Sequence, residues 1–183
     1  MNLLVNVVAF KVGWLSSVVG GANGIPYLGP LVVLVAIVLH LYLVREPRRE
    51  LALILMTALI GAFWDSIMVS VGWVSYDTGM FAAGLAPYWI IGMWMLFATT
   101  LNVAFRRLQP HLVFAAVLGA VSGPLSYIAG EKIGAITFVD KPAALTGLAV
   151  AWAIMLPGLL VLARQFDGVQ AGDAAAAPQE ART

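Results

Sequence analysis

The stretch LALILMTALIGAFWDSIMVSVGW, residues 51–73, decides the fold class of this protein. It contains one charged side chain, Asp65, and a helix of this length, at about 1.5 Å per residue, crosses the roughly 30 Å hydrocarbon core of a bilayer. Five more apolar runs of comparable length lie at about residues 2–20, 30–45, 87–105, 111–131 and 142–163. The sequence therefore predicts an all-α polytopic membrane protein, a compact bundle of six transmembrane helices.

The composition of the chain agrees with a membrane protein. Of the 183 residues, 62% are hydrophobic and only 10% are charged, and the mean hydropathy is +0.95. Soluble domains carry about 25% charged residues, so the chain lies outside that class. Six helices and their connectors fill residues 1–166 as one transmembrane domain, and the small, polar residues 167–183 are expected to form a disordered cytoplasmic tail.

The charged and metal-binding residue types exclude several kinds of function. A net charge of +1 gives no reason to expect nucleic acid as a partner. The absence of cysteine excludes thiol catalysis and thiolate metal sites, and the two histidines, His40 and His111, lie far apart in the sequence. We therefore expect no metal and no cofactor. The expected partners are membrane lipids, and a membrane-protein partner or a homo-oligomer stays open.

The arginines predict the orientation of the helices. Six of them fall on alternate connectors or just after the last helix: Arg45, Arg48, Arg49, Arg106, Arg107 and Arg164. The other connectors hold only Lys132 and Lys141, which are offset by Glu131 and Asp140. Because cytoplasmic loops carry an excess of Lys and Arg, both termini are expected to be cytoplasmic.

The three connectors on the opposite side are rich in glycine and aromatic residues. Each ends in a proline near the first turn of the returning helix, at Pro30, Pro87 or Pro142. This pattern favours three helical hairpins, residues 1–45, 51–107 and 111–164. Two inverted repeats of three helices each, a common transporter plan, remain the alternative.

Asp65 is the main candidate for a functional residue. Eight residues separate it from Trp73 at the outer edge, which places its carboxyl group about 12 Å below that surface. An ionisable group at this depth is costly unless it is paired or hydrated, and it marks either a polar site or a structural hydrogen bond. Lys11 lies at a similar depth, and if the two helices are adjacent, the pair could keep both groups charged.

Other side chains of the outer half complete the candidate site. Trp64, Trp73 and Tyr76 belong to an aromatic belt or to a binding site, and Tyr127 shares a helix face with Glu131. We take Asp65 as the candidate catalytic residue. The candidate ligand-binding residues are Lys11, Trp64, Tyr88, Trp89, Tyr127 and Glu131.

Seven segments of the chain carry a family resemblance: FKVGW (10–14), LGP (28–30), EPRREL (46–51), FWDS (63–66), LAPYWI (85–90), LFATTLNV (96–103) and GPLSYIAGEKIGAI (123–136). Together they resemble an uncharacterised family of small bacterial inner-membrane proteins, the domain-of-unknown-function family 2878. The resemblance spans about residues 1–166. It implies a multi-pass location in the bacterial inner membrane and a compact helical bundle, but no activity, substrate or cofactor.

Three functions remain open at this point. The leading hypothesis is an integral membrane protein with a buried polar site in the outer half that binds a lipid or an apolar small molecule. The first alternative is a lipid- or isoprenoid-modifying enzyme with Asp65 as general acid, since the spacing of Asp65, GWVSY and PYW is loosely similar to membrane carotenoid cyclases. The second alternative is a small proton-coupled transporter.

Overall fold

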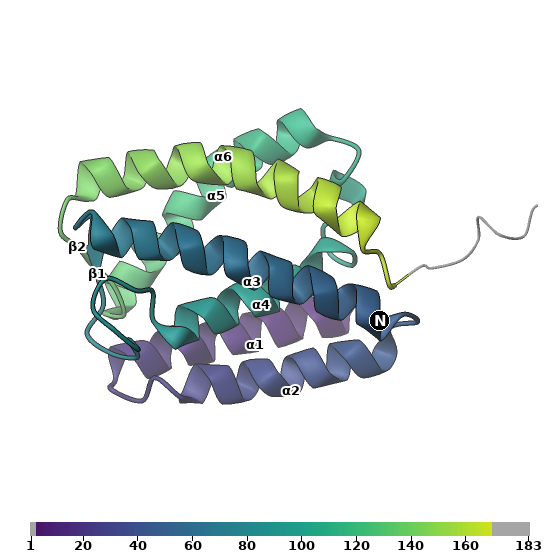
Figure 1. Ribbon diagram of the computed structural model, residues 1–183, viewed down its shortest axis with the longest axis horizontal. Coiled ribbons are helices and arrows are strands. Elements are labelled where there is room, and N and C mark those ends of the chain that lie inside the picture. The colour runs from purple at the N-terminus through teal and green to yellow at the C-terminus, as the bar shows by residue number, and fades with distance from the viewer. Residues whose placement is uncertain (1–2, 170–183) are drawn as a thin grey trace, which may run out of the picture.

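The computed structural model describes residues 3–169 and shows one bundle of α-helices (Figure 1). In chain order the helices are α1 (Leu3–Ala22), α2 (Leu28–Leu43), α3 (Pro47–Ser70), α4 (Tyr88–Leu101), α5 (Leu112–Ile133) and α6 (Lys141–Gln165). Two short strands, β1 (Val74–Ser75) and β2 (Thr137–Phe138), and a 3-10 turn, η1 (Arg106–Leu108), lie in the connectors. The predicted all-α bundle of six helices is confirmed.

Four of these helices are long and apolar enough to cross a membrane: α1, α3, α5 and α6. The other two are apolar but shorter, with 16 residues in α2 and 14 in α4. At about 1.5 Å per residue α4 extends only about 21 Å. The predicted run 87–105 was too long at its end, because the chain leaves α4 after Leu101 and Asn102 turns toward the interior. The chain is a multi-pass membrane protein.

The helices pair as three hairpins. The most extensive helix contacts join α1 to α2, α3 to α4, and α5 to α6, as the proline pattern predicted. The short helix α4 also packs against α1 and α2, so it occupies the middle of the bundle (Figure 1). The α5–α6 hairpin contacts α1, α3 and α4 much less extensively. The bundle is therefore a four-helix part, α1 to α4, with the α5–α6 hairpin joined to one side.

A folded cap covers the end of the bundle where β1 and β2 lie. The two strands pair antiparallel, with Val74 opposite Phe138, and they join the connectors after α3 and α5. The connector between α3 and α4 is held by two more hydrogen bonds, from Thr78 Oγ1 to the carbonyl oxygen of Gly21 and from Trp89 Nε1 to the carbonyl oxygen of Thr78. This connector is consequently an ordered wall over the bundle.

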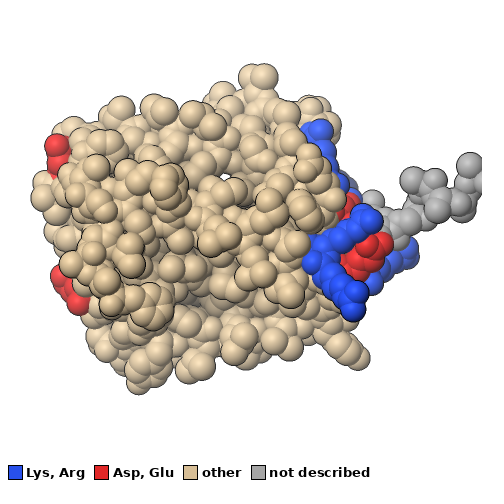
Figure 2. Space-filling model, in the orientation of Figure 1, with Lys and Arg blue, Asp and Glu red and all other residues tan. Residues whose placement is uncertain are grey.

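Charged residues gather at the two ends. Figure 2 shows Lys and Arg side chains concentrated at the end of the bundle where α3 begins and α6 finishes, with acidic side chains among them and also at the opposite end. The six arginines of the sequence pattern belong to the first of these, which we call the arginine end: Arg45, Arg48, Arg49, Arg106, Arg107 and Arg164. The concentration of arginines at one end follows the predicted alternation of the connectors.

A buried polar cluster lies beneath the arginine end. The Glu50 carboxylate, fully buried, accepts hydrogen bonds from Asn102 Nδ2 and from the backbone N–H of Gly168, both at 2.9 Å. Its other oxygen lies 2.9 Å from Nε2 of His40, and Gln109 Nε2 donates to the side-chain oxygen of Asn102. His40 is only 1% exposed, because it pairs with Glu50. We call His40, Glu50, Asn102 and Gln109 the Glu50 cluster.

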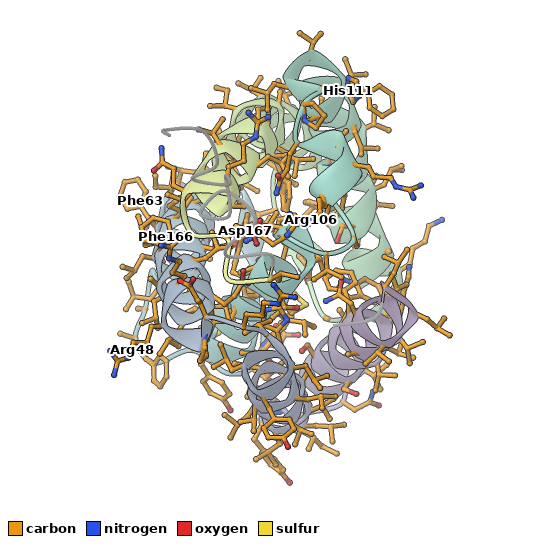
Figure 3. All side chains as sticks on the ribbon, turned by 90° about the vertical axis from the view of Figure 1, so that its right-hand side faces the viewer. Arg48, Phe63, Arg106, His111, Phe166 and Asp167 are labelled. Atoms are coloured by element: carbon orange, nitrogen blue, oxygen red, sulfur yellow. The ribbon has the colours of Figure 1, made fainter. Side chains whose placement is uncertain are left out.

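The segment after α6 is part of the bundle as far as it is described. Arg106 and Asp167 face one another at the arginine end (Figure 3) and form a two-bond ion pair at 2.7 and 2.9 Å. The carbonyl oxygen of Gly168 accepts the backbone N–H groups of Arg45 and Glu46. Residues 167–169, assigned to the tail from the sequence, thus contact the bundle. The rest of the predicted tail lies outside the described residues.

Candidate functional site

The Asp65 carboxylate is the centre of a buried hydrogen-bond cluster. Asp65 lies in the last third of α3 and is fully buried. Trp94 Nε1 of α4 donates to Oδ2 at 2.6 Å, and the Tyr127 hydroxyl of α5 donates to Oδ1 at 2.5 Å. The Tyr76 hydroxyl, from the segment after β1, makes a longer contact of 3.4 Å with Oδ1. These four residues, the Asp65 cluster, join three helices and the cap.

Tyr76 reaches this cluster because the strand pair holds its backbone at the end of α3. Its ring packs edge-on against Trp89, with ring centroids 5.6 Å apart. Burial, and after it the nearby Asp65 carboxylate, raises the pKa of the Tyr76 hydroxyl well above its ordinary value. The hydroxyl therefore stays protonated and remains a hydrogen-bond donor toward Asp65.

Glycines position the two tryptophans on the inner side of the cluster. A Cβ on Gly61, one turn before Asp65, would lie 2.0 Å from the Trp94 ring, so only glycine lets this ring rest on α3. A Cβ on Gly123 of α5 would lie 2.4 Å from the Trp152 ring of α6. The Trp94 and Trp152 rings stack on one another, with centroids 4.9 Å apart and planes 15° apart. The glycine positions on α3 and α5 thus leave room for the stacked pair of indole rings.

An aromatic cavity lies beside this stacked pair, between α1, α4, α5 and α6. Its inner part has a volume of about 70 Å³ and its wider outer part about 310 Å³. Both parts share five lining residues: Phe10, Trp14, Phe97, Ser126 and Trp152. Trp94 and Tyr127 line the inner part, and Lys11 lines the outer part. Ligand sites of about 300 Å³ and more, with apolar walls and few polar groups, are typical of small-molecule binding.

The cavity exists because α1 and α5 meet at one end only. Figure 1 shows α5 crossing the bundle obliquely, near α1 at the capped end and away from it toward the arginine end. His111, just before α5, lies on the far side of the molecule from α1 when the arginine end faces the viewer (Figure 3). Contacts between α1 and α5 are correspondingly few. The outer part of the cavity opens through this gap, where Ser122 and Ser126 are exposed.

The structure brings together only some of the predicted site residues. Asp65 and Tyr127 are in direct contact, as described. Lys11 is exposed at the cavity mouth, and within residues 3–169 no ion pair joins it to Asp65. Helix α1 packs mainly on α2 and α4, whereas α3 packs mainly on α4, so α4 stands between the two charged groups. The pairing that similar depths suggested is not formed.

The remaining predicted residues support the cap. Trp89 is fully buried and holds the connector through Thr78, and Tyr88 packs against Phe81 with ring centroids 5.3 Å apart. Glu131 pairs with Lys141 at 2.5 Å, which ties the end of α5 to the start of α6. Trp64 packs against the main core with its ring N–H buried and without a hydrogen-bond partner. None of these four lines the inner or the outer part of the aromatic cavity.

The sequence interpretation missed most of the cavity wall. Phe10, Trp14, Trp94, Phe97 and Trp152 lie inside apolar runs, where an aromatic residue looks like any other packing residue. One signal was available, since Gly61 and Gly123 each mark a close approach between helices. Their partners come from other helices, however, and cannot be read from spacing along the chain.

The Asp65 carboxylate is separated from the aromatic cavity by its own hydrogen-bond donors. Within residues 3–169 no group of three or more His, Asp or Glu side chains could hold a metal ion. Asp65 itself does not line either part of the aromatic cavity, because Trp94 and Tyr127 stand between its carboxylate and the open space. The carboxylate therefore acts on the cavity by fixing the positions of these two side chains.

A comparison with family models matches residues 3–158 to the family described as Protein of unknown function (DUF2878). Searches of curated proteins and of solved structures find no match. The function has to be inferred from the geometry.

Proposed function

This chain belongs to the family Protein of unknown function (DUF2878), and we propose that it is a membrane protein that binds a lipid or an apolar small molecule in the aromatic cavity. The observation that carries this proposal is that Trp94 and Tyr127 both line the cavity and donate to the buried Asp65 carboxylate. A buried charge is costly in lipid, and here its hydrogen bonds fix the cavity wall.

The shape of the cavity fits a ligand that enters from the bilayer. Its walls are aromatic, and its mouth lies between two helices rather than at the capped end. Apolar ligands dissolved in the membrane reach such a site laterally without crossing water. A rigid aromatic wall binds an acyl or isoprenoid chain with little loss of side-chain entropy, since the rings are already fixed by stacking and hydrogen bonds.

We further propose that the protein lies in the bacterial inner membrane with both termini cytoplasmic. The arginine end then faces the cytoplasm, in agreement with the excess of basic residues in cytoplasmic loops. The cap formed by β1, β2 and the connector between α3 and α4 faces the opposite compartment. The cavity mouth, where Lys11, Ser122 and Ser126 are exposed, then opens laterally to the bilayer.

The geometry around Asp65 favours ligand binding over the two alternatives, a lipid-modifying enzyme and a proton-coupled transporter. A general acid must come within hydrogen-bond reach of its substrate, and a proton-coupled transporter needs a path from its acid to water. Asp65 lies behind Trp94 and Tyr127, and its oxygens already accept three hydrogen bonds. The enzyme and the transporter would both require this cluster to open.

The test is to fill the cavity without disturbing the fold. Ser126 is exposed and lines both parts of the cavity, so Ser126→Trp should occupy the space in which a ligand lies. Leu125→Trp is the matched control, because Leu125 neighbours Ser126 on α5, is 58% exposed and lines neither part of the cavity. Each protein is purified in mild detergent, and its bound small molecules are identified by mass spectrometry.

We expect the wild type and Leu125→Trp to carry the same apolar compound and Ser126→Trp to lose it at an unchanged melting temperature. Equal amounts of the compound in Ser126→Trp and Leu125→Trp would show that it binds elsewhere on the surface. A wild-type protein that carries no specific compound after extraction from its native membrane would contradict the proposal.

A further inference from the structure

Lys11 is a basic side chain in the middle of a membrane helix. It is the ninth of the 20 residues of α1, about 12 Å along the helix from Leu3. Every other Lys or Arg among residues 3–169 lies in a connector or in the first or last turn of a helix. Such intramembrane charges normally face an interior or a cavity and pair with an opposite charge.

The acidic side chains of the helices are occupied by other groups. Asp65 accepts hydrogen bonds from Trp94, Tyr127 and Tyr76. Four other acids have ion-pair partners: Glu50 has His40, Glu131 has Lys141, Glu46 has Arg49, and Asp167 has Arg106. Asp77 and Asp140 lie in the connectors at the capped end, and Asp140 accepts the backbone N–H of Ala143. Within the described residues no ion pair or hydrogen bond is found for the Lys11 ammonium group.

The surroundings of Lys11 are those of a ligand mouth rather than of open lipid. The outer part of the aromatic cavity is lined by Lys11 together with Ser122 and Ser126 of α5, whose hydroxyls add polar groups at the same place. The inner part is lined mainly by apolar and aromatic residues, and Lys11 does not line it. The cavity is thus basic and polar at its mouth and aromatic inside. These properties are complementary to an amphiphile with an anionic head and an apolar chain.

We propose that the ligand of the aromatic cavity is an anionic amphiphile, whose carboxylate or phosphate pairs with Lys11 while its chain lies along Phe10, Trp14 and Trp152. This inference rests on the proposed function and adds the chemical class of the ligand. The ligand anion supplies the countercharge that the protein does not provide to Lys11. Lys11, Ser122 and Ser126 are all exposed, so a head group can reach Lys11 from outside the bundle.

The experiment compares two probes that differ only in charge. Cis-parinaric acid is a fluorescent fatty acid that accepts excitation energy from nearby tryptophans, and Trp14, Trp94 and Trp152 line the cavity. Its methyl ester has the same chain without the charge. Binding of both is measured by energy transfer to the full chain in detergent micelles, at mildly alkaline pH, where the carboxylate is ionised.

We expect the acid to bind the wild type about tenfold more tightly than the ester, the preference of about 1.4 kcal/mol that one good ion pair supplies. Lys11→Met should abolish this preference and leave ester binding unchanged, and Lys11→Arg should retain it. Lys132→Met is the matched control, since it removes the same charge from an exposed position of α5 that lines neither part of the cavity, and it should keep the preference.

A second arm separates the two kinds of anion. Lysophosphatidic acid and uncharged monoacylglycerol compete for the bound probe, so a preference for the phosphate over its neutral counterpart identifies a phospholipid-type ligand, and a preference for the fatty acid alone identifies a carboxylate. If neither anion is preferred over its neutral counterpart, or if Lys11→Met keeps the preference, the assignment to Lys11 is wrong although the cavity still binds apolar molecules. If no probe binds at all, the proposed function itself fails.

Discussion

Replacing Asp65 by leucine or by asparagine separates the structural part of its role. Leucine removes both carboxylate oxygens and leaves the Trp94 N–H and the Tyr127 hydroxyl, which now donate at 2.6 and 2.5 Å, without an acceptor. A buried donor left unsatisfied costs about 1–3 kcal/mol, so two of them cost about 2–6 kcal/mol. The Tyr76 contact at 3.4 Å adds little, because hydrogen bonds of that length are weak. Removing a desolvated carboxylate returns part of this cost, and we expect a net loss of about 3 kcal/mol.

Asparagine should be far less harmful. Its side-chain oxygen can still accept from Trp94, whose ring N–H is a donor only. Its amide N–H can donate to Tyr127, since a hydroxyl can reverse its role and accept. Only the charge assistance of the hydrogen bonds is lost, and we expect a cost of about 1 kcal/mol.

Thermal unfolding in detergent measures the difference. For a chain of this length, 1 kcal/mol corresponds to a shift of about 2–4 °C, so Asp65→Leu should melt about 6–12 °C below the wild type and Asp65→Asn about 2–4 °C below it. Asp77→Asn is the control, because Asp77 is exposed in the same cap, and surface changes of this kind stay within about 0.5 kcal/mol.

Two results would refute this reasoning. If Asp65→Leu melts within about 2 °C of the wild type, the hydrogen bonds to Trp94 and Tyr127 do not stabilise the bundle. If Asp65→Asn melts as low as Asp65→Leu, the charge itself is required, and a positively charged partner of Asp65 must then form in the membrane. In the expected case, ligand binding by Asp65→Asn also reports whether the cavity needs the charge or only the hydrogen bonds.

Two further predictions concern the arginine end. Glu50→Ala should destabilise the protein by about 3 kcal/mol or more in the same thermal assay, because it leaves the buried His40 and Asn102 side chains without their partner. The control Glu46→Ala breaks a half-exposed pair with Arg49 and should cost less than about 1 kcal/mol. Equal effects of the two substitutions would mean that the Glu50 cluster contributes no stability. Reporter fusions placed after Arg49, Tyr76, Gln109, Asp140 and the C-terminus should alternate between cytoplasm and outside, beginning in the cytoplasm. A C-terminus on the outside would contradict the proposed orientation.

The helices could be predicted from the sequence because bilayer thickness imposes a length on apolar runs. Each of the six apolar runs, including the one that contains Asp65, corresponds to a helix in the structure. The prolines at positions 30, 87 and 142 predicted which helices pair as hairpins. The error in predicting where α4 ends is explained by one long-range contact. Asn102 is surrounded by apolar residues in the sequence, but its side chain turns inward to Glu50, 52 positions earlier. No periodicity records such a partner.

The candidate site was predicted less completely than the fold. The sequence identified Asp65 and Tyr127 because intramembrane acids and deep tyrosines are rare, and the structure joins them. It did not identify Trp94, which contacts the same carboxylate 29 positions away, nor the pairing of β1 with β2 that brings Tyr76 there. The depth of a residue in the membrane can be estimated from its position along a helix, but the neighbours of that helix cannot. Lys11 and Asp65 lie on helices separated by α4, and this angular arrangement is set by packing.

The two buried carboxylates of α3 have a common effect on α4. Helices in a bilayer gain no hydrophobic free energy from contacting one another, so close packing and hydrogen bonds decide where each one lies. Helix α4 has only 14 residues, yet α3 bonds to its middle through Asp65 and Trp94, and to the turn that ends it through Glu50 and Asn102. A short helix held in this way sits centrally while α5 leans across it, and the space left between α1 and α5 is the aromatic cavity. Loss of either carboxylate should therefore change ligand binding through α4 even though neither one lines the cavity.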